Sequence, residues 1–175
     1  MKNFFRKVAF GIGPNEQAPS DPLKWALDQV NDVPELSWKG KIYSEKELRK
    51  HYRDWVYGDR KVLRKKYKDN KTLYKTHKDI LRHKTGQKFW ESLEISIRHN
   101  EGINSSHPVL AKLWMFWGNF FAISEKDFLA NYSTGPYQRE IIRPNLNQTF
   151  EKITRRGRLC CPASCRQLAQ IRIVV

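Results

Sequence analysis

Positions 107–124 read HPVLAKLWMFWGNFFAIS and contain the most apolar run of this 175-residue chain. Pro108 fits the first position of a helix, where a missing backbone N–H costs nothing. The large side chains that follow point in nearly every direction around a helix axis, so most sides of the helix should be covered. We therefore expect the centre of a core here, formed by Leu110, Leu113, Trp114, Phe116, Trp117, Phe120 and Phe121.

The same run is a poor candidate for a membrane span. Val109 to Ile123 is 15 residues long and includes Lys112 and Asn119, whereas a spanning helix needs about 20 mostly apolar residues. The first ten residues carry three basic side chains but no continuous apolar stretch, so no export signal is predicted. The cytoplasm is the default compartment.

Working outward, the chain carries local signals for further helices. Asp21 can cap a helix that begins at Pro22, and Leu23, Ala26, Leu27 and Val30 share one helical face. Ser44 and Glu47 form a capping-box pair. Apolar stripes at helical spacing continue with Leu48, Tyr52 and Trp55; Val62, Leu63 and Tyr67; Leu73, His77, Ile80 and Leu81; and Phe89, Trp90, Leu93 and Ile97.

Similar local signals occur toward the end of the chain. A break is expected at positions 100–102, a cap at Ser124 with Asp127, a turn at 133–136, and a short helix from Tyr137 stopped by Pro144. No stretch shows the strict alternation of an amphipathic strand. The sequence therefore predicts a mainly α fold, a helical domain around a buried apolar helix near 108–121.

The charge is large and concentrated. The formal net charge is +15, and positions 39–88 hold 18 Lys and Arg against 6 Asp and Glu. Such a segment attracts polyanions such as nucleic acid. Its aromatic side chains can stack on bases, a pattern typical of single-stranded nucleic-acid binding. The candidate contacts are Lys61, Arg64, Lys65, Lys66, Tyr67, Lys68, Lys71, Tyr74 and Lys75.

A second candidate site lies near the end of the chain. Arg139, Glu140 and Arg143 occupy neighbouring helical positions. Either a structural ion-pair network or a site for an anionic ligand fits them. Asn119, in an otherwise apolar helix, needs a hydrogen-bond partner if it is buried. Glu91 and Glu94 lie one turn apart, as catalytic carboxylates can, but such pairs usually face solvent.

No cofactor, metal or small-molecule ligand is inferred. The five histidines form no i, i+4 pair, and phosphate-loop and nucleophile-elbow motifs are absent. Cys160, Cys161 and Cys165 lack the paired spacing of a zinc site. No catalytic residue is assigned.

The apolar run and its surroundings resemble a bacterial family called "domain of unknown function 1800". The similar elements are HPVLAKLWMFWGNFFAIS at 107–124, YQREIIRP at 137–144 and FE at 150–151. AFG at 9–11 and DPLKW at 21–25 are similar to the start of the family. The resemblance covers residues 1 to about 153 and implies a helical fold without an established reaction.

Two departures from the family shape the functional expectation. Phe120 stands where the family has a histidine, so any role of that histidine is lost. Family members are also much longer, and positions 154–175 change character. Synonymous codons for positions 166–175 can be chosen so that a shifted frame reads Ser-Ile-Gly-Ala-Asn-Pro-Asn-Arg-Gly, which resembles the family's continuation. We therefore expect a helical domain in residues 1–153, incomplete at its carboxy end, followed by a frameshifted tail.

Three functional hypotheses follow. The first is an amino-terminal fragment of this family without independent catalytic activity. The second is a basic module that binds nucleic acid or another polyanion. The third, from the resemblance, is the remnant of a hydrolase whose site lies mostly beyond this chain.

Overall fold

The computed structural model describes residues 2–12, 17–121, 130–153 and 155. This part of the chain is mainly helical and contains no strand, which confirms the predicted fold class. The expected cap at Ser124, the three cysteines and, apart from residue 155, the tail at 154–175 lie outside the described residues.

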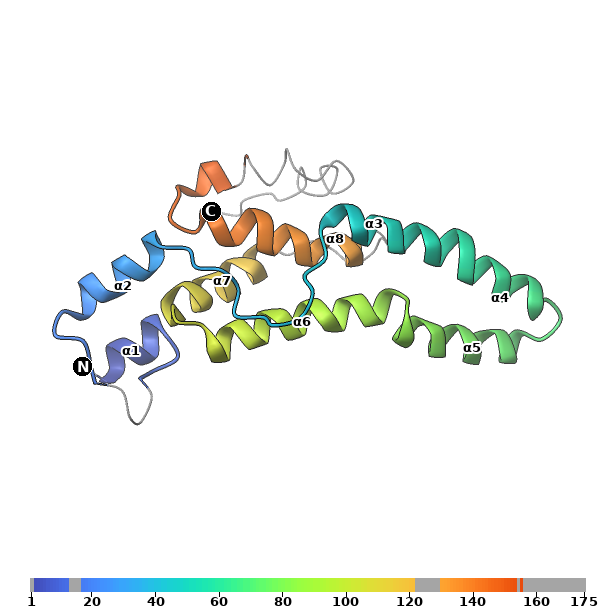
Figure 1. Ribbon diagram of the computed structural model, residues 1–175, viewed down its shortest axis with the longest axis horizontal. Coiled ribbons are helices and arrows are strands. Elements are labelled where there is room, and N and C mark those ends of the chain that lie inside the picture. The colour runs from blue at the N-terminus through green and yellow to red at the C-terminus, as the bar shows by residue number, and fades with distance from the viewer. Residues whose placement is uncertain (1, 13–16, 122–129, 154, 156–175) are drawn as a thin grey trace.

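Two long helical segments form an antiparallel hairpin (Figure 1). The first consists of α3 (Glu45–Arg53), the π-helical turn η1 (Asp54–Asp59) and α4 (Arg60–Lys66). The second returns through α5 (Lys71–Lys84) and α6 (Gln87–Asn104). We call residues 60–84, at the end of the hairpin where α4 meets α5, the basic arm.

The core lies beside α3 and α6, the half of the hairpin that is not the basic arm. The apolar helix α7 (Pro108–Phe120) packs on α6. A continuous helical segment made of α8 (Ala130–Pro136), η2 (Tyr137–Ile142) and η3 (Arg143–Asn145) contacts α3, α6 and α7. This arrangement places helices on two sides of α7.

Two short helices complete the structure at the end opposite the arm (Figure 1). They are α1 (Lys2–Val8) and α2 (Pro22–Asn31), and α2 packs on α7. Val109, Ala26 and Ala9 form a small buried cluster between them. The amino-terminal helices therefore cover the beginning of α7.

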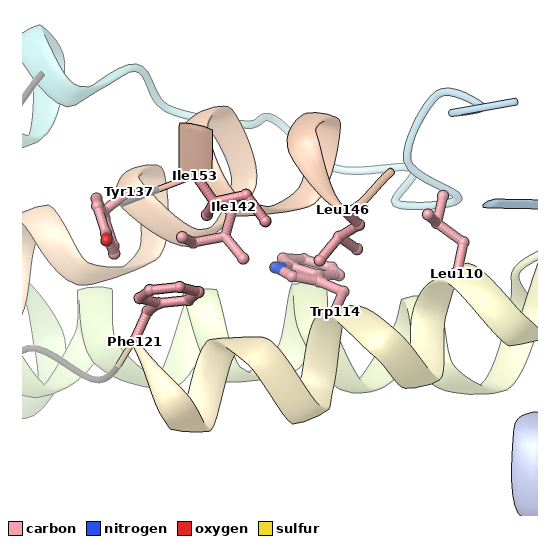
Figure 2. Packing of buried hydrophobic residues seen from close by; sticks show 7 residues of the cluster. All are labelled: Leu110, Trp114, Phe121, Tyr137, Ile142, Leu146 and Ile153. Carbon is pink, nitrogen blue, oxygen red and sulfur yellow. The ribbon is translucent and has the colours of Figure 1, made fainter. Parts of the chain in front are cut away.

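Figure 2 shows the main core, which lies between α7 and the chain from η2 to residue 153. Its buried members are Leu110, Trp114, Phe121, Tyr137, Ile142, Leu146 and Ile153. The expectation that this helix centres the core is confirmed. The expectation that it is covered on most sides is only partly met, because Phe116 is 61% exposed and Phe120 is 50% exposed.

The capping signals at Asp21 and at Ser44 are confirmed. The Asp21 carboxylate accepts a hydrogen bond from the backbone N–H of Lys24 at 3.0 Å. Ser44 and Glu47 form the reciprocal capping box at the start of α3. The predicted buried face of α2 was wrong in part, because Leu23 and Leu27 are exposed while Gln29 is buried and accepts from the N–H of Val109.

Two predicted breaks do not occur. Helix α6 continues to Asn104, through the expected stop at 100–102. The expected turn at 133–136 is helical, because α8 runs to Pro136. A Cβ atom on Gly135 would collide with the side chain of Glu94, so this glycine permits close packing of α8 on α6 rather than a turn.

Substitution by alanine should have opposite effects on stability at two glycines of the hairpin, Gly58 and Gly86. Gly58 lies in η1, and a Cβ added there would have no neighbouring atom within 4 Å, whereas at Gly86 a Cβ would lie 2.9 Å from the Cα of Arg82. We expect Gly58→Ala to stabilise the protein by about 0.5–1 kcal/mol, since alanine favours helix. Gly86→Ala should destabilise it by about 1–3 kcal/mol through overpacking. Urea unfolding measures the free energy of unfolding of both variants. Changes of the same sign would contradict the difference in free space between the two positions.

Candidate nucleic-acid interface and polar network

The basic arm brings cationic side chains from two helices together. Its 25 residues hold eleven Lys and Arg, and its acidic residues are Asp69 and Asp79. The predicted basic contacts are all exposed, namely Lys61, Arg64, Lys65, Lys66, Lys68, Lys71 and Lys75. The structure thus gathers these residues at one end of the hairpin (Figure 1).

The turn of the arm is fixed by local interactions. Asn70 caps α5 by accepting a hydrogen bond from the N–H of Leu73 at 3.0 Å. The last turn of α4 holds three basic residues, Arg64, Lys65 and Lys66. Positive charge there interacts favourably with the negative end of the helix dipole. Helix α5 has no fully buried residue. The arm is therefore held by the Asn70 cap, by side-chain contacts and by a single buried apolar residue, Leu63 of α4.

The two tyrosines of the predicted interface are engaged within the arm. The ring of Tyr67 stacks on His77 with centroids 4.6 Å apart and planes 6° apart, and Lys66 Nζ lies 5.3 Å from the same ring. Lys78 Nζ lies 5.8 Å from the ring of Tyr74. These contacts favour a role of the rings in packing the arm, not the predicted stacking on bases.

The hydroxyl group of Tyr74 adds to this packing. Burial raises its pKa, but the guanidinium groups of Arg60 and Arg64 beside it outweigh burial and lower the pKa below 10.0. Tyr74 therefore bridges the two helices of the arm through the basic residues of α4. Arg64 is exposed all the same and remains accessible to a ligand.

The second predicted site lies between α6 and η2 and is a set of ion pairs. Arg139 donates from Nε and Nη2 to the two carboxylate oxygens of Glu94, both at 2.9 Å, and also to the carbonyl of Tyr43 at 2.8 Å. Arg98 donates to the Gln138 side chain at 2.7 Å. These contacts support the interpretation as a structural network.

Arg143 forms a second buried ion pair with α6. Its Nη2 donates to Glu101 at 2.9 Å, and Glu101 also accepts from the N–H and hydroxyl of Ser37 at 2.9 and 2.7 Å. Burial raises the pKa of Glu101, but Ser37 and Arg143 outweigh it and the net shift is downward. The carboxylate is therefore held in its charged form.

The other two predicted residues, Glu140 and Asn119, are both exposed. Glu140 is about half exposed and lies 3.5 Å from Arg139. Burial raises its pKa, although the charge of Arg139 acts in the opposite direction. Asn119 is exposed on α7, so it does not need a buried partner. Neither residue completes a site for an anionic ligand.

Sequence reasoning missed the acidic partners. Glu94 was expected to face solvent and Glu101 to lie in a helix break, yet Glu94 pairs with Arg139 of η2 and Glu101 with Arg143 of η3. Their spacing of seven residues places them on one helical face and is the signal that was available. Ser37 has no such signal, because it contacts Glu101 across 64 positions.

Among the described residues, no cluster of histidine, cysteine and carboxylate side chains has the composition for a metal ion. Within the same residues, no helix is long and apolar enough to cross a membrane. Comparisons with protein-family models, with curated proteins and with solved structures gave no match.

Proposed function

We propose that this chain binds nucleic acid through the basic arm. The observation that carries the proposal is the exposure of seven Lys and Arg side chains from both helices at one end of the hairpin, where the acidic residues are Asp69 and Asp79. Such a surface neutralises phosphates and releases the counterions condensed on them.

The geometry of the arm favours contacts to the phosphate backbone. Tyr67 and Tyr74 are packed against residues of the arm itself. We therefore do not expect their rings to stack on the bases of a bound nucleic acid. Duplex DNA carries one negative charge per about 1.7 Å of its axis, which suits recognition by charge alone. We therefore propose binding to a duplex without sequence preference.

The test is a salt titration of a short fluorescent DNA duplex between about 50 and 200 mM salt. The variant replaces Lys65, Lys66, Lys68 and Lys71 with glutamine. The slope of log affinity against log salt should become shallower by about 0.9 for each phosphate contact removed, and hence by roughly 3 to 4. Affinity at low salt should fall as well.

A matched control removes the same charge elsewhere. Lys7, Lys24, Lys39 and Lys152 are exposed and lie outside the arm, so their replacement with glutamine should leave most of the slope intact. Equal losses in the two variants would show that only net charge matters and would refute the arm as the site. An unchanged slope in the arm variant would do the same.

We also propose, from the motifs alone, that the chain is related to the family called "domain of unknown function 1800" and lacks independent catalytic activity. Motif residues Trp114, Arg139 and Arg143 lie in the core or in buried ion pairs, which supports a role of these motifs in folding. The hydrolase hypothesis gains no support from the described geometry. Sequencing the coding locus past position 175 tests the frameshift.

A further inference from the structure

A cavity of about 500 Å³ lies along α3 and η1, outside the basic arm and the polar network. Its lining residues are Glu45, Lys46, Arg49, Tyr52, Arg53 and Tyr57. Pockets for small molecules generally have volumes of about 300–1,000 Å³, so this cavity is large enough for a compact ligand. We call it the α3–η1 cavity.

Two aromatic rings supply its apolar surface. Tyr52 is half-buried and contacts Tyr132 edge-on, with ring centroids 5.5 Å apart. Tyr57 is 69% exposed, unlike the tyrosines that pack inside the arm. The two rings stand five positions apart along the helix. Both rings line the cavity, so a flat ligand there can contact the exposed ring of Tyr57 and the accessible part of Tyr52.

The charge in the cavity is positive. Glu45 accepts from Arg49 at 2.7 Å, so these two residues largely neutralise each other. Lys46 and Arg53 are both exposed, and neither forms an ion pair with a described residue. Two cationic side chains are thus available to an anionic group beside the rings.

The backbone at the cavity contains a π-helical turn, as η2 also does beside the ion pair of Arg139. Tyr57 lies in the π-helical turn η1, which begins directly after Arg53. Single π turns within α-helices are rare and occur frequently at functional sites. Gly58 follows Tyr57 with open space around it, so no close contact at that position accounts for the turn.

We propose that the α3–η1 cavity binds a small phosphorylated aromatic compound of the mononucleotide class. Its ring stacks on Tyr57 beside Tyr52, and its phosphate binds Lys46 and Arg53. This inference goes beyond nucleic-acid binding by the arm and does not depend on it, because none of the lining residues belongs to residues 60–84.

The test uses the full chain with adenosine monophosphate, adenosine and ribose 5-phosphate as calorimetric probes. Adenosine monophosphate should bind saturably, and each of the other two should bind roughly tenfold or more weakly, because each lacks one recognised group. Tyr57→Ala and Arg53→Gln should each weaken binding by a similar factor. Both side chains are exposed, and circular dichroism should confirm that both variants fold.

Lys66→Gln in the arm is the matched control and should leave mononucleotide affinity unchanged. The proposal is overturned if adenosine monophosphate shows no saturable binding, or if ribose 5-phosphate or adenosine binds as tightly as the nucleotide. It is also overturned if Tyr57→Ala or Arg53→Gln retains full affinity. The arm variant should lose duplex binding without losing mononucleotide binding. Each proposal can therefore be refuted without affecting the other.

Discussion

Replacement of Glu101 with alanine is expected to lower the free energy of unfolding by about 3–5 kcal/mol. Glu101 is 1% exposed and is the ion-pair partner of Arg143, which is itself buried. Without the carboxylate, the guanidinium stays in a buried position with an uncompensated charge, which costs about this much. The N–H and hydroxyl of Ser37 lose their acceptor as well. Urea unfolding measures the change.

Glu35→Ala is the control for this experiment. Glu35 is exposed, and removal of an exposed carboxylate usually changes stability by less than about 0.5 kcal/mol. A double variant, Glu101→Leu with Arg143→Met, should recover much of the loss, because it removes the unpaired charge. If Glu101→Ala is as stable as Glu35→Ala, the buried ion pair is not a determinant of stability.

The downward shift of the Glu101 pKa adds a dependence on pH. Since the folded-state pKa lies below the ordinary value of 4.5, the contribution of this carboxylate is fully present above 4.5. It is lost as the pH falls through the folded-state pKa. Acid unfolding of the wild type should therefore be steeper than that of Glu101→Gln. Identical stability profiles for the wild type and Glu101→Gln between neutral and acidic pH would contradict the lowered pKa of Glu101.

The second large effect is expected for Trp114→Ala, with a loss of about 3–5 kcal/mol. Trp114 is 1% exposed at the centre of the main core (Figure 2). Its indole N–H donates to the carbonyl of Gln138 at 2.9 Å, and the Arg143 guanidinium lies 5.8 Å from its ring. The substitution leaves a cavity and removes the hydrogen bond between α7 and η2. Thermal unfolding should show a clearly lower midpoint.

Phe116→Ala is the matched control on the same helix. Phe116 is 61% exposed, so its removal creates no buried cavity and should cost well under the loss at Trp114. Comparable losses at the two positions would mean that α7 is covered on the face where Phe116 lies. Trp114→Phe should fall between these limits, because it keeps an aromatic ring but removes the N–H donor.

The elements that could be predicted from the sequence are those with local causes. The caps at Asp21 and Ser44 depend on hydrogen bonds to residues three positions away, so their signals are contained in short stretches. The central position of α7 follows from its density of large apolar side chains. The basic arm was also visible, because its charges are adjacent in the sequence.

The interactions that escaped prediction have partners far away in the chain. Glu101 meets Arg143 across 42 positions and Ser37 across 64, and no local pattern indicates either contact. The exposed Leu23 and Leu27 show the same limit, because helical spacing identifies a face but not what covers it. Tyr67 stacks on His77 of the neighbouring helix, a contact that the apolar spacing within each helix does not indicate.

The arm lacks a buried core in α5, and this has a consequence for how salt acts on the protein. Folding holds eleven positive charges closer together than an unfolded chain would, and their mutual repulsion works against the helical hairpin. Added salt screens that repulsion and strengthens the fold of the arm. The same ions compete with phosphates and weaken the binding of a duplex. A bound polyanion also neutralises the repelling charges, so ligand binding and the folding of the arm are thermodynamically linked.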